Sequence, residues 1–171
     1  RALEDVSFDI QPGQTTALVG PSGAGKSTII QMLLRFYDPN AGKVLLDDIN
    51  LRDMEKDKFR RFISTVPQDP IIFASSIMEN IHFGRPSANF KEVISAAEMA
   101  AAHDFISELP DGYASFVGER GIMLSGGQKQ RISIARALIR NTNILIFDDC
   151  LSALDNETEE KILSSLKKED T

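Results

Sequence analysis

The chain has 171 residues and a mass of 18.9 kDa, a length that suits one domain or one domain with an inserted subdomain. Hydrophobic residues make up 42% and charged residues 26% of it, which excludes a disordered or fibrous protein. The formal net charge of −6 offers no electrostatic basis for binding duplex nucleic acid, so we expect no nucleic-acid partner.

The single cysteine, Cys150, cannot form a disulfide within the chain, which favours a reducing, cytosolic compartment. No stretch of the sequence approaches the roughly 20 apolar residues that cross a bilayer. Any association with a membrane is therefore expected to go through a partner.

The first third of the chain alternates between strand and helix patterns. We expect strands over 2–10 and 15–19, a helix over 26–37, and further strands over 44–46 and 62–66. Glycine- or proline-containing sequence separates them, and the order strand, glycine-rich turn, helix stands at residues 15–37.

The remainder is richer in helix. Alanine runs predict helix between about 79 and 109, and a second helical pattern begins at 128. It leads into an apolar strand over 144–147 and a charged, amphipathic helix over 157–168. Alternating strands and helices indicate an α/β fold with a mainly parallel sheet, into which the helical stretch is inserted.

The segment Gly20–Thr28 has the pattern G-x-x-x-x-G-K-[ST] between a predicted strand and a predicted helix. In this setting glycines let the backbone wrap an anion, and the helix start supplies N–H groups. We expect Lys26 to reach the β- and γ-phosphates of a nucleotide and Ser27 to ligate Mg²⁺. The predicted nucleotide-binding residues here are Gly20, Pro21, Ser22, Gly23, Ala24, Gly25, Lys26, Ser27 and Thr28.

Two carboxylates follow the apolar strand over 144–147. Asp148 stands where a magnesium-binding acid is needed at the end of a neighbouring strand. Asp149, the next residue, stands where a second carboxylate could orient or deprotonate the attacking water.

Together with these segments, Leu124–Arg131 (LSGGQKQR) resembles the signature of the ATP-binding cassette (ABC) family. Gln68 is similar to the glutamine of the family's Q-loop, and Ser152–Asp155 is similar to its D-loop. The resemblance implies that Gln68 serves catalysis and metal binding. It also implies that a nucleotide is contacted by the signature residues Ser125, Gly126, Gly127 and Gln128.

The resemblance covers nearly the whole chain and implies a P-loop NTPase core with N-terminal antiparallel strands and an inserted α-helical subdomain. Residues 1–75 and 130–171 would form the ATPase core, and 76–129 the helical subdomain. The family's adenine-stacking aromatic and switch histidine are expected before residue 1 and after residue 171, so we expect a fragment of a cassette.

In this family two cassettes sandwich two ATP molecules, each held between the phosphate loop of one chain and the signature of the other. Residues 71–84 and 117–121 are similar to the segments of exporters that touch the coupling helices of transmembrane domains. The resemblance therefore implies ATP and Mg²⁺ as cofactors, a second cassette and the transmembrane domains of an exporter as partners, and a place at the cytoplasmic face of the membrane. Ser115 and Phe116 depart from the Thr-Glu that exporters often have at those positions.

Asp149 departs from the glutamate usual at that position in competent cassettes. Aspartate is shorter by one methylene, which withdraws the carboxylate by roughly 1.5 Å, and misplacement of about 1 Å can cost on the order of 100-fold in rate. We therefore expect slow hydrolysis at this chain's own site. With an intact signature, this resembles the degenerate-site subunit of heterodimeric exporters.

Two alternatives remain open. A soluble cassette of the chromosome-maintenance or DNA-repair type would need a long coiled-coil or zinc insertion between Gln68 and Ser125, where the chain has about 56 residues and no cysteine. A cassette that binds ATP as a regulatory signal and scarcely hydrolyses it is compatible with Asp149.

Overall fold

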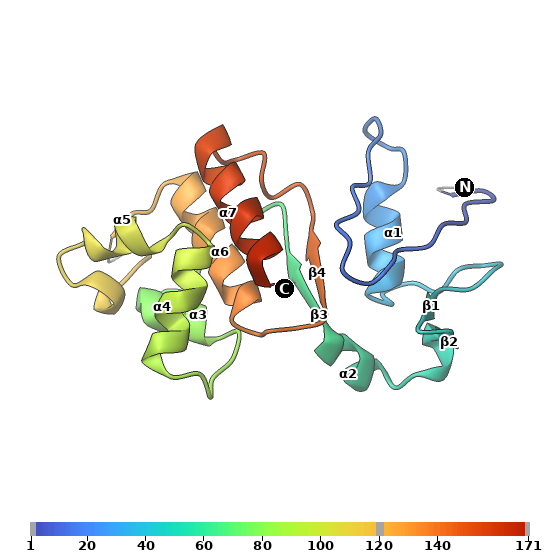
Figure 1. Cartoon of the computed structure of the whole chain (residues 1–171), viewed down its shortest axis with the longest axis horizontal. Coiled ribbons are helices and arrows are strands. Elements are labelled where there is room, and N and C mark those ends of the chain that lie inside the picture. Colours follow the sequence, from blue (N-terminus) through green and yellow to red (C-terminus); the bar gives the residue numbers. More distant parts are fainter. Residues whose placement is uncertain (1–2, 119–121, 170–171) are drawn as a thin grey trace. The chain divides into compact units, whose positions relative to one another are not determined.

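The computed structural model describes residues 3–118 and 122–169, and the chain divides into two compact units (Figure 1). Unit 1 is Arg1–Ile63 and unit 2 is Ser64–Thr171. Unit 1 contains α1 (Lys26–Leu33), β1 (Leu45–Leu46), β2 (Ile49–Asn50), α2 (Lys56–Phe59) and 3₁₀ turns at Leu51–Asp53 and Arg60–Phe62.

The two short strands of unit 1 form an antiparallel hairpin, in which Leu45 pairs with Asn50 and Leu46 with Ile49. The two residues between them, Asp47 and Asp48, have φ angles of 48° and 65°. Positive φ at both central residues is what a two-residue hairpin of type I′ requires, and aspartate tolerates it better than most residues.

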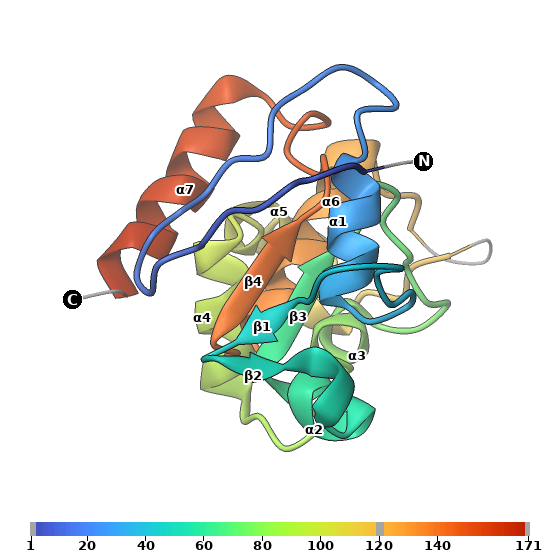
Figure 2. The same ribbon diagram turned by 90° about the vertical axis from the view of Figure 1, so that its right-hand side faces the viewer.

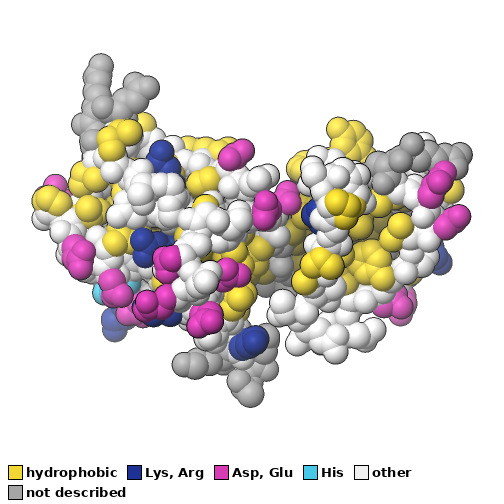
Figure 3. All heavy atoms as spheres, turned by 90° about the horizontal axis from the view of Figure 1, so that it is seen from above, with side chains coloured by type: hydrophobic (Ala, Val, Ile, Leu, Met, Phe, Trp, Pro, Cys, Tyr) yellow, Lys and Arg dark blue, Asp and Glu magenta, His cyan; other side chains and the backbone are white. Residues whose placement is uncertain are grey.

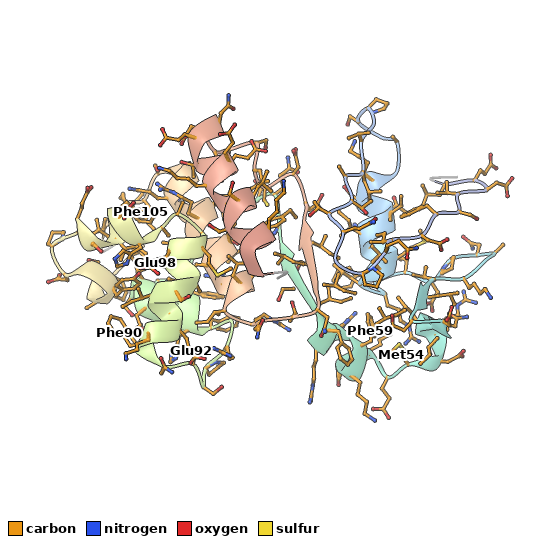
Figure 4. All side chains as sticks on the ribbon, viewed as in Figure 1. Met54, Phe59, Phe90, Glu92, Glu98 and Phe105 are labelled. Atoms are coloured by element: carbon orange, nitrogen blue, oxygen red, sulfur yellow. The ribbon has the colours of Figure 1, made fainter. Side chains whose placement is uncertain are left out.

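Arginine side chains hold the C-terminal end of α1 to the rest of unit 1. Arg35 has a φ of 54°, and its Nη1 donates to the Met54 carbonyl oxygen at 2.6 Å (Met54 is labelled in Figure 4). Arg60 donates to the free carbonyl oxygen of Leu34 from Nε at 3.2 Å and from Nη2 at 3.1 Å. The helix predicted over 26–37 therefore ends early, because the left-handed Arg35 turns the chain.

No strand forms within the described residues 3–25, so the strands predicted over 2–10 and 15–19 are not present. Alternating Val6, Phe8 and Ile10 are 52%, 48% and 50% exposed, so the apolar face of the pattern is not buried. A strand needs a neighbour to pair its backbone groups, and these residues have none among the described residues of unit 1. Antiparallel pairing in unit 1 comes from β1 and β2 instead.

Unit 2 pairs a small sheet with helices. Its elements are β3 (Ile63–Val66, whose first residue closes unit 1), α3 (Ile77–His82), α4 (Phe90–Met99), α5 (His103–Ser107), a 3₁₀ turn (Gly112–Ala114), α6 (Gly126–Leu138), β4 (Ile144–Phe147) and α7 (Asn156–Glu169). The strand predicted over 144–147 and the helix predicted from 157 are thereby confirmed, and the strand predicted over 62–66 is confirmed from Ile63 onward.

Strands β3 and β4 lie side by side and run in the same direction (Figure 2). Helix α6 packs against α3 and α4 and carries a large part of the core of unit 2. The fully buried residues of unit 2 include Val66, Ile77, Ile81, Val93, Ile106, Val117, Ile132, Ile134 and Ile162. The result is an α/β arrangement in which the C-terminal end of β3 leads to Gln68 and the C-terminal end of β4 leads to Asp148.

The helical stretch predicted between about 79 and 109 consists of the three helices α3, α4 and α5, because local capping and turn residues begin and end each of them. Asn89 caps α4 with a reciprocal pair of bonds: Glu92 N donates to Asn89 Oδ1 at 3.1 Å and Asn89 N to Glu92 Oε2 at 2.7 Å (Glu92 is labelled in Figure 4). The bond from the Asn89 backbone to the carboxylate, followed by the charge and the hydrogen bond of Arg85, lowers the pKa of Glu92. Ala101, with a φ of 51°, then separates α4 from α5.

Both units expose hydrophobic as well as charged side chains. On the face seen in Figure 3, acidic and basic side chains are interspersed over unit 2. Hydrophobic side chains at the surface of unit 1 include Val6, Phe8, Ile10, Val19, Phe36, Tyr37, Leu45, Ile49 and Phe62. In the described part of the chain, no helix has the length and hydropathy of a membrane span.

Candidate nucleotide-binding site

The loop before α1 presents the bare start of a helix. Gly25 is the N-cap residue, with a φ of 92° and no side chain to accept from the first N–H groups of α1. Gly23, with a φ of 81°, is also in the left-handed region that favours glycine. The first four N–H groups of a helix have no acceptor within it, so this end offers donors and the positive end of the helix dipole.

Lys26, the first residue of α1, folds back over the loop. Its Nζ donates to the Gly20 carbonyl oxygen at 2.6 Å and to the Pro21 carbonyl oxygen at 3.0 Å. The ammonium group therefore lies over the loop that the glycines shape. The neighbouring Ser27 is exposed, so its hydroxyl is accessible to a ligand. Helix start, lysine and hydroxyl together fit the triphosphate of a nucleotide with its Mg²⁺.

In unit 2 the chain leaving β4 is tied to the chain leaving β3. Asp148 N donates to the Val66 carbonyl oxygen at 3.0 Å, directly after both strands end. Asp149 follows with a φ of 49°, in a region that L residues rarely adopt. Ser152 Oγ donates to the Asp149 carbonyl oxygen at 2.8 Å and holds this turn.

The side chains of Gln68 and Asp149 meet beside this turn. Gln68 Nε2 donates to Asp149 Oδ2 at 3.4 Å, across 81 positions of sequence. Because the amide nitrogen faces Asp149, the amide oxygen of Gln68 remains for a cation. Within unit 2, Asp148 and Gln68 carry oxygen atoms of the kind that Mg²⁺ prefers. Within the described residues no group of three His, Cys, Asp or Glu could hold a metal alone.

An open pocket of about 320 Å³ lies next to the carboxylate turn. Its lining residues are Phe147, Asp149, Cys150, Leu151, Ser152 and Glu159. The Asp149 carboxylate is therefore accessible from solvent through this pocket.

The predicted signature forms the N-terminal end of α6. Ser125 is the N-cap residue: its Oγ accepts from Gln128 N at 3.2 Å, and Gln128 Oε1 accepts from Ser125 N at 2.9 Å. The hydroxyl proton of Ser125 is not used by this capping box and can be donated to a ligand.

The two signature glycines are not required by packing inside the described chain. A Cβ at Gly126 would meet no atom within 4 Å, and a Cβ at Gly127 would make only ordinary contacts, with the Ala153 carbonyl oxygen at 3.6 Å and Leu154 Cδ2 at 3.7 Å. The open space at Gly126 therefore faces outward from this chain.

The predicted D-loop leads directly into α7. Asp155 accepts from Thr158 N at 2.9 Å and from Thr158 Oγ1 at 2.7 Å. These two bonds, the backbone one first, lower the pKa of the Asp155 carboxyl, and the charge of Arg131 lowers it further. In this chain Asp155 acts as a helix cap.

The segment over 71–84 is anchored to α6 by one arginine. Arg136 donates from Nε to the Asn80 carbonyl oxygen at 2.7 Å and from Nη1 to the Ile71 carbonyl oxygen at 2.7 Å. Its guanidinium also stacks over the Phe73 ring, 4.7 Å from the centroid. Burial lowers the pKa of Arg136. Of the other expected coupling segment, 117–121, only Val117 and Gly118 are described, and residues 119–121 lie outside the described residues.

The structure thus brings Gln68, Asp148 and Asp149 together in unit 2, where α6 also carries Ser125–Gln128. The loop Gly20–Thr28 belongs to unit 1. Reading the sequence overlooked one polar residue near the carboxylates, the fully buried Gln130. Gln130 precedes the buried Ser133 and Ala137 by three and seven residues, a helical spacing that places all three on the core face of α6. This spacing could have identified Gln130 as a buried residue from the sequence.

Comparisons with known proteins agree with this geometry. The family model described as "ABC transporter" matches residues 3–152. The mitochondrial iron-sulfur clusters transporter ATM1 of Kluyveromyces lactis is 48% identical over 166 residues, covering 97% of this chain and 23% of that protein. The β-(1→2)glucan export ATP-binding/permease protein NdvA of Brucella abortus is 49% identical over 166 residues, covering 97% of this chain and 28% of that protein.

Among solved structures, a bacterial Atm1-family ABC exporter with ATP bound matches with a TM-score of 0.91 and 47% sequence identity. The match covers 96% of this chain and 29% of that one. This chain therefore spans less than a third of the length of these relatives. With the family match extending over most of its residues, the chain belongs to the ABC transporter family.

Proposed function

We propose that this chain is the nucleotide-binding domain of an ABC exporter, which binds and hydrolyses Mg·ATP to drive transport through attached transmembrane domains. The observation that carries the proposal is the loop Gly20–Thr28, in which a glycine-capped helix start and Lys26 Nζ converge. Converging N–H groups and an ammonium recognise a polyphosphate, and the adjacent hydroxyl adds a magnesium ligand.

Each predicted site residue has a chemical role in this proposal. Lys26 and the N–H groups at the start of α1 neutralise the β- and γ-phosphates. Ser27, Asp148 and Gln68 would hold Mg²⁺, and the chemistry it would supply is to offset the negative charge of the phosphates. Asp149 accepts a proton from the attacking water, and the hydrogen bond from Gln68 orients its carboxylate.

The signature supports pairing with a second cassette. Gly126 leaves open space on the outside of α6, where the N–H groups at the helix start and the spare hydroxyl proton of Ser125 are available. Such donors suit the γ-phosphate of a nucleotide that another chain holds. Ser125, Gly126, Gly127 and Gln128 would therefore complete a partner's site.

Export across a membrane is supported by the relatives. The names of the ATM1 and NdvA proteins describe transport or export, and the matching solved structure is of an exporter. As part of such a protein, this chain would lie at the cytoplasmic face, with the segment over 71–84 contacting the coupling helices. Arg136 binds that segment to α6, so a movement of the signature would be transmitted to the segment that contacts the coupling helices.

Asp149 supports slow hydrolysis at this chain's own site and, with it, a heterodimer in which the partner carries the faster site. The shorter carboxylate would stand roughly 1.5 Å further from the attacking water than a glutamate. A displacement of this size can cost on the order of 100-fold in rate. If hydrolysis at this site were slow enough to be negligible, the chain would be a regulatory cassette that responds to ATP binding alone.

The test is titration of the full-length protein with Mg·ATP, comparing the wild type, Lys26→Ala and Lys43→Ala. Lys43 is an exposed lysine in the same unit and serves as the matched control. We expect the Lys26 variant to bind at least about tenfold more weakly, since a charge-assisted phosphate contact is lost, and the Lys43 variant to match the wild type. Equal affinity of all three proteins would refute the assignment, and binding without any hydrolysis would favour the regulatory cassette.

A further inference from the structure

One polar side chain in the core of unit 2 interacts with a chain neighbour of Gln68 and with a chain neighbour of Asp149. Gln130 of α6 is 0% exposed, and its Nε2 donates to the Pro67 carbonyl oxygen at 3.3 Å. Its side chain also interacts with the thiol of Cys150, which is 1% exposed. Pro67 directly precedes Gln68 in the chain, and Cys150 directly follows Asp149.

Packing alone does not explain an amide at this position. The Oε1 atom of Gln130 is buried and has no hydrogen-bond donor among the described residues. Leaving a buried polar atom without a partner destabilises the folded state, because the atom gives up its hydrogen bonds to water. A methionine would fill nearly the same volume without that cost, so the amide is better explained by what its Nε2 holds in place.

The turn that Gln130 supports is one that needs support. Asp149 adopts a φ of 49°, a left-handed conformation that costs free energy in a non-glycine residue even though aspartate tolerates it better than most, so contacts on either side of it stabilise the turn. From the outer side, Ser152 Oγ holds the Asp149 carbonyl oxygen at 2.8 Å. Cys150, the next residue after Asp149, is buried, and its thiol interacts with the Gln130 side chain.

We propose that Gln130 is a positioning residue for ATP hydrolysis, which sets the separation of Gln68 and Asp149 through their chain neighbours. The proposal rests on the function proposed above, because it concerns hydrolysis at this chain's own site. The pair touches at 3.4 Å, near the limit of a hydrogen bond, so a small shift of either neighbour breaks the contact. Gln130 itself is buried in the core and acts only through Pro67 and Cys150.

The test uses the full-length protein with Gln130→Met, which preserves volume and removes both polar contacts. ATP hydrolysis is measured against ATP concentration, and the turnover of Lys26→Ala is subtracted, so that only hydrolysis dependent on this chain's loop is counted. We expect kcat to fall about tenfold, while KM changes less than about twofold, because the phosphate loop is untouched.

Ile132→Val is the matched structural control, since Ile132 is equally buried on α6 and carries no polar group. It should lower the unfolding temperature slightly, because a buried methyl group is lost, and leave kcat unchanged. Gln130→Met combined with Gln68→Ala should lose no more activity than Gln68→Ala alone, because the first change acts through the second residue. Cys150→Ala, which removes one contact and keeps Gln130, should give a smaller loss, of about threefold, in the same direction.

The outcomes separate this proposal from the function it rests on. Unchanged kcat in both Gln130→Met and Cys150→Ala, an equal loss in Ile132→Val, or independent losses in the double variant would overturn the role of Gln130 alone. A wild type that hydrolyses ATP no faster than Lys26→Ala would overturn hydrolysis at this site, and the role of Gln130 with it.

Discussion

Gly84, just after α3, lies directly against Arg136 of α6, and a Cβ atom on the glycine would overlap the Arg136 carbonyl oxygen. The same Cβ would come within 2.8 Å of Ile139 Cγ2. Backbone cannot move aside as a flexible side chain does, so α3 and α6 can pack this closely only with glycine at the contact. Gly126, at the other end of α6, is the opposite case, since a Cβ there would meet no atom within 4 Å.

The pair Gly84→Ala and Gly126→Ala therefore makes the same chemical change with opposite consequences. Gly84→Ala should destabilise unit 2 by about 1–3 kcal/mol through overpacking. Gly126→Ala should keep or slightly raise the unfolding temperature, because alanine favours helix, yet it should weaken ATP-dependent pairing of cassettes. Thermal unfolding and sedimentation with Mg·ATP measure the two effects. A stable Gly84→Ala protein would contradict the packing described here.

The carboxylate turn and the signature should contribute unequally to the hydrolysis of the full transporter. Asp149→Asn removes a carboxylate that is one methylene shorter than glutamate, from a site that we expect to hydrolyse ATP slowly already, so the steady-state hydrolysis of the full transporter should fall less than about twofold. Gly126→Asp places a negative charge where the partner's γ-phosphate is expected, and should cost about 100-fold, similar to losing an oxyanion donor. Thermal unfolding of both variants checks that the fold is retained. The reverse ranking would mean that Asp149 serves the faster site.

Asn80 holds the segment over 71–84 to α6 from a fully buried position. Its Oδ1 accepts from Phe73 N and from Arg136 Nη2, both at 2.8 Å, and its Nδ2 donates to the Phe73 carbonyl oxygen at 3.0 Å. Asn80→Ala should cost about 1–3 kcal/mol in the free energy of unfolding, because the half-buried Arg136 guanidinium and the Phe73 backbone lose a hydrogen-bond partner. Denaturant unfolding measures this loss.

The exposed Asn156 provides the control for that measurement, and Asn156→Ala should change stability by no more than about 0.5 kcal/mol. Similar values for the two asparagine variants would show that the Asn80 network is not stabilising.

The start of α3 should make stability depend on pH. Ser76 N donates to Glu79 Oε2 at 2.9 Å, and Ser76 Oγ lies at the same distance. These bonds, the backbone one first, lower the pKa of Glu79 from its usual 4.5. A lowered carboxyl pKa adds stability that is present above the usual value and is lost as the pH falls through the folded-state value.

Glu79→Gln keeps the cap and removes the titrating group. Its unfolding temperature should therefore fall less than that of the wild type between about pH 6 and about pH 3. Ser76→Ala should lose about 1 kcal/mol already at neutral pH, because the helix loses its N-cap. An identical pH dependence in the wild type and Glu79→Gln would show that this carboxyl does not couple to folding.

Local sequence determined those parts of the protein whose physics is local. The strand over 144–147 was predictable because four apolar residues end at two acids. Helix α6 begins at Gly126, two residues before the predicted helical pattern, because Ser125 and Gln128 form a capping box that starts it earlier. The glycines and lysine of Gly20–Thr28 predict a phosphate loop from their spacing alone.

Only the tertiary structure decided where distant segments meet. The strands expected over 2–10 and 15–19 need neighbours to pair with, so a correct alternating pattern was not enough to form them. The 81-residue separation of Gln68 and Asp149 is closed by the pairing of β3 with β4. That pairing then placed Pro67 and Cys150 within reach of Gln130, a contact that no spacing in the sequence encodes because it depends on how α6 packs against the sheet.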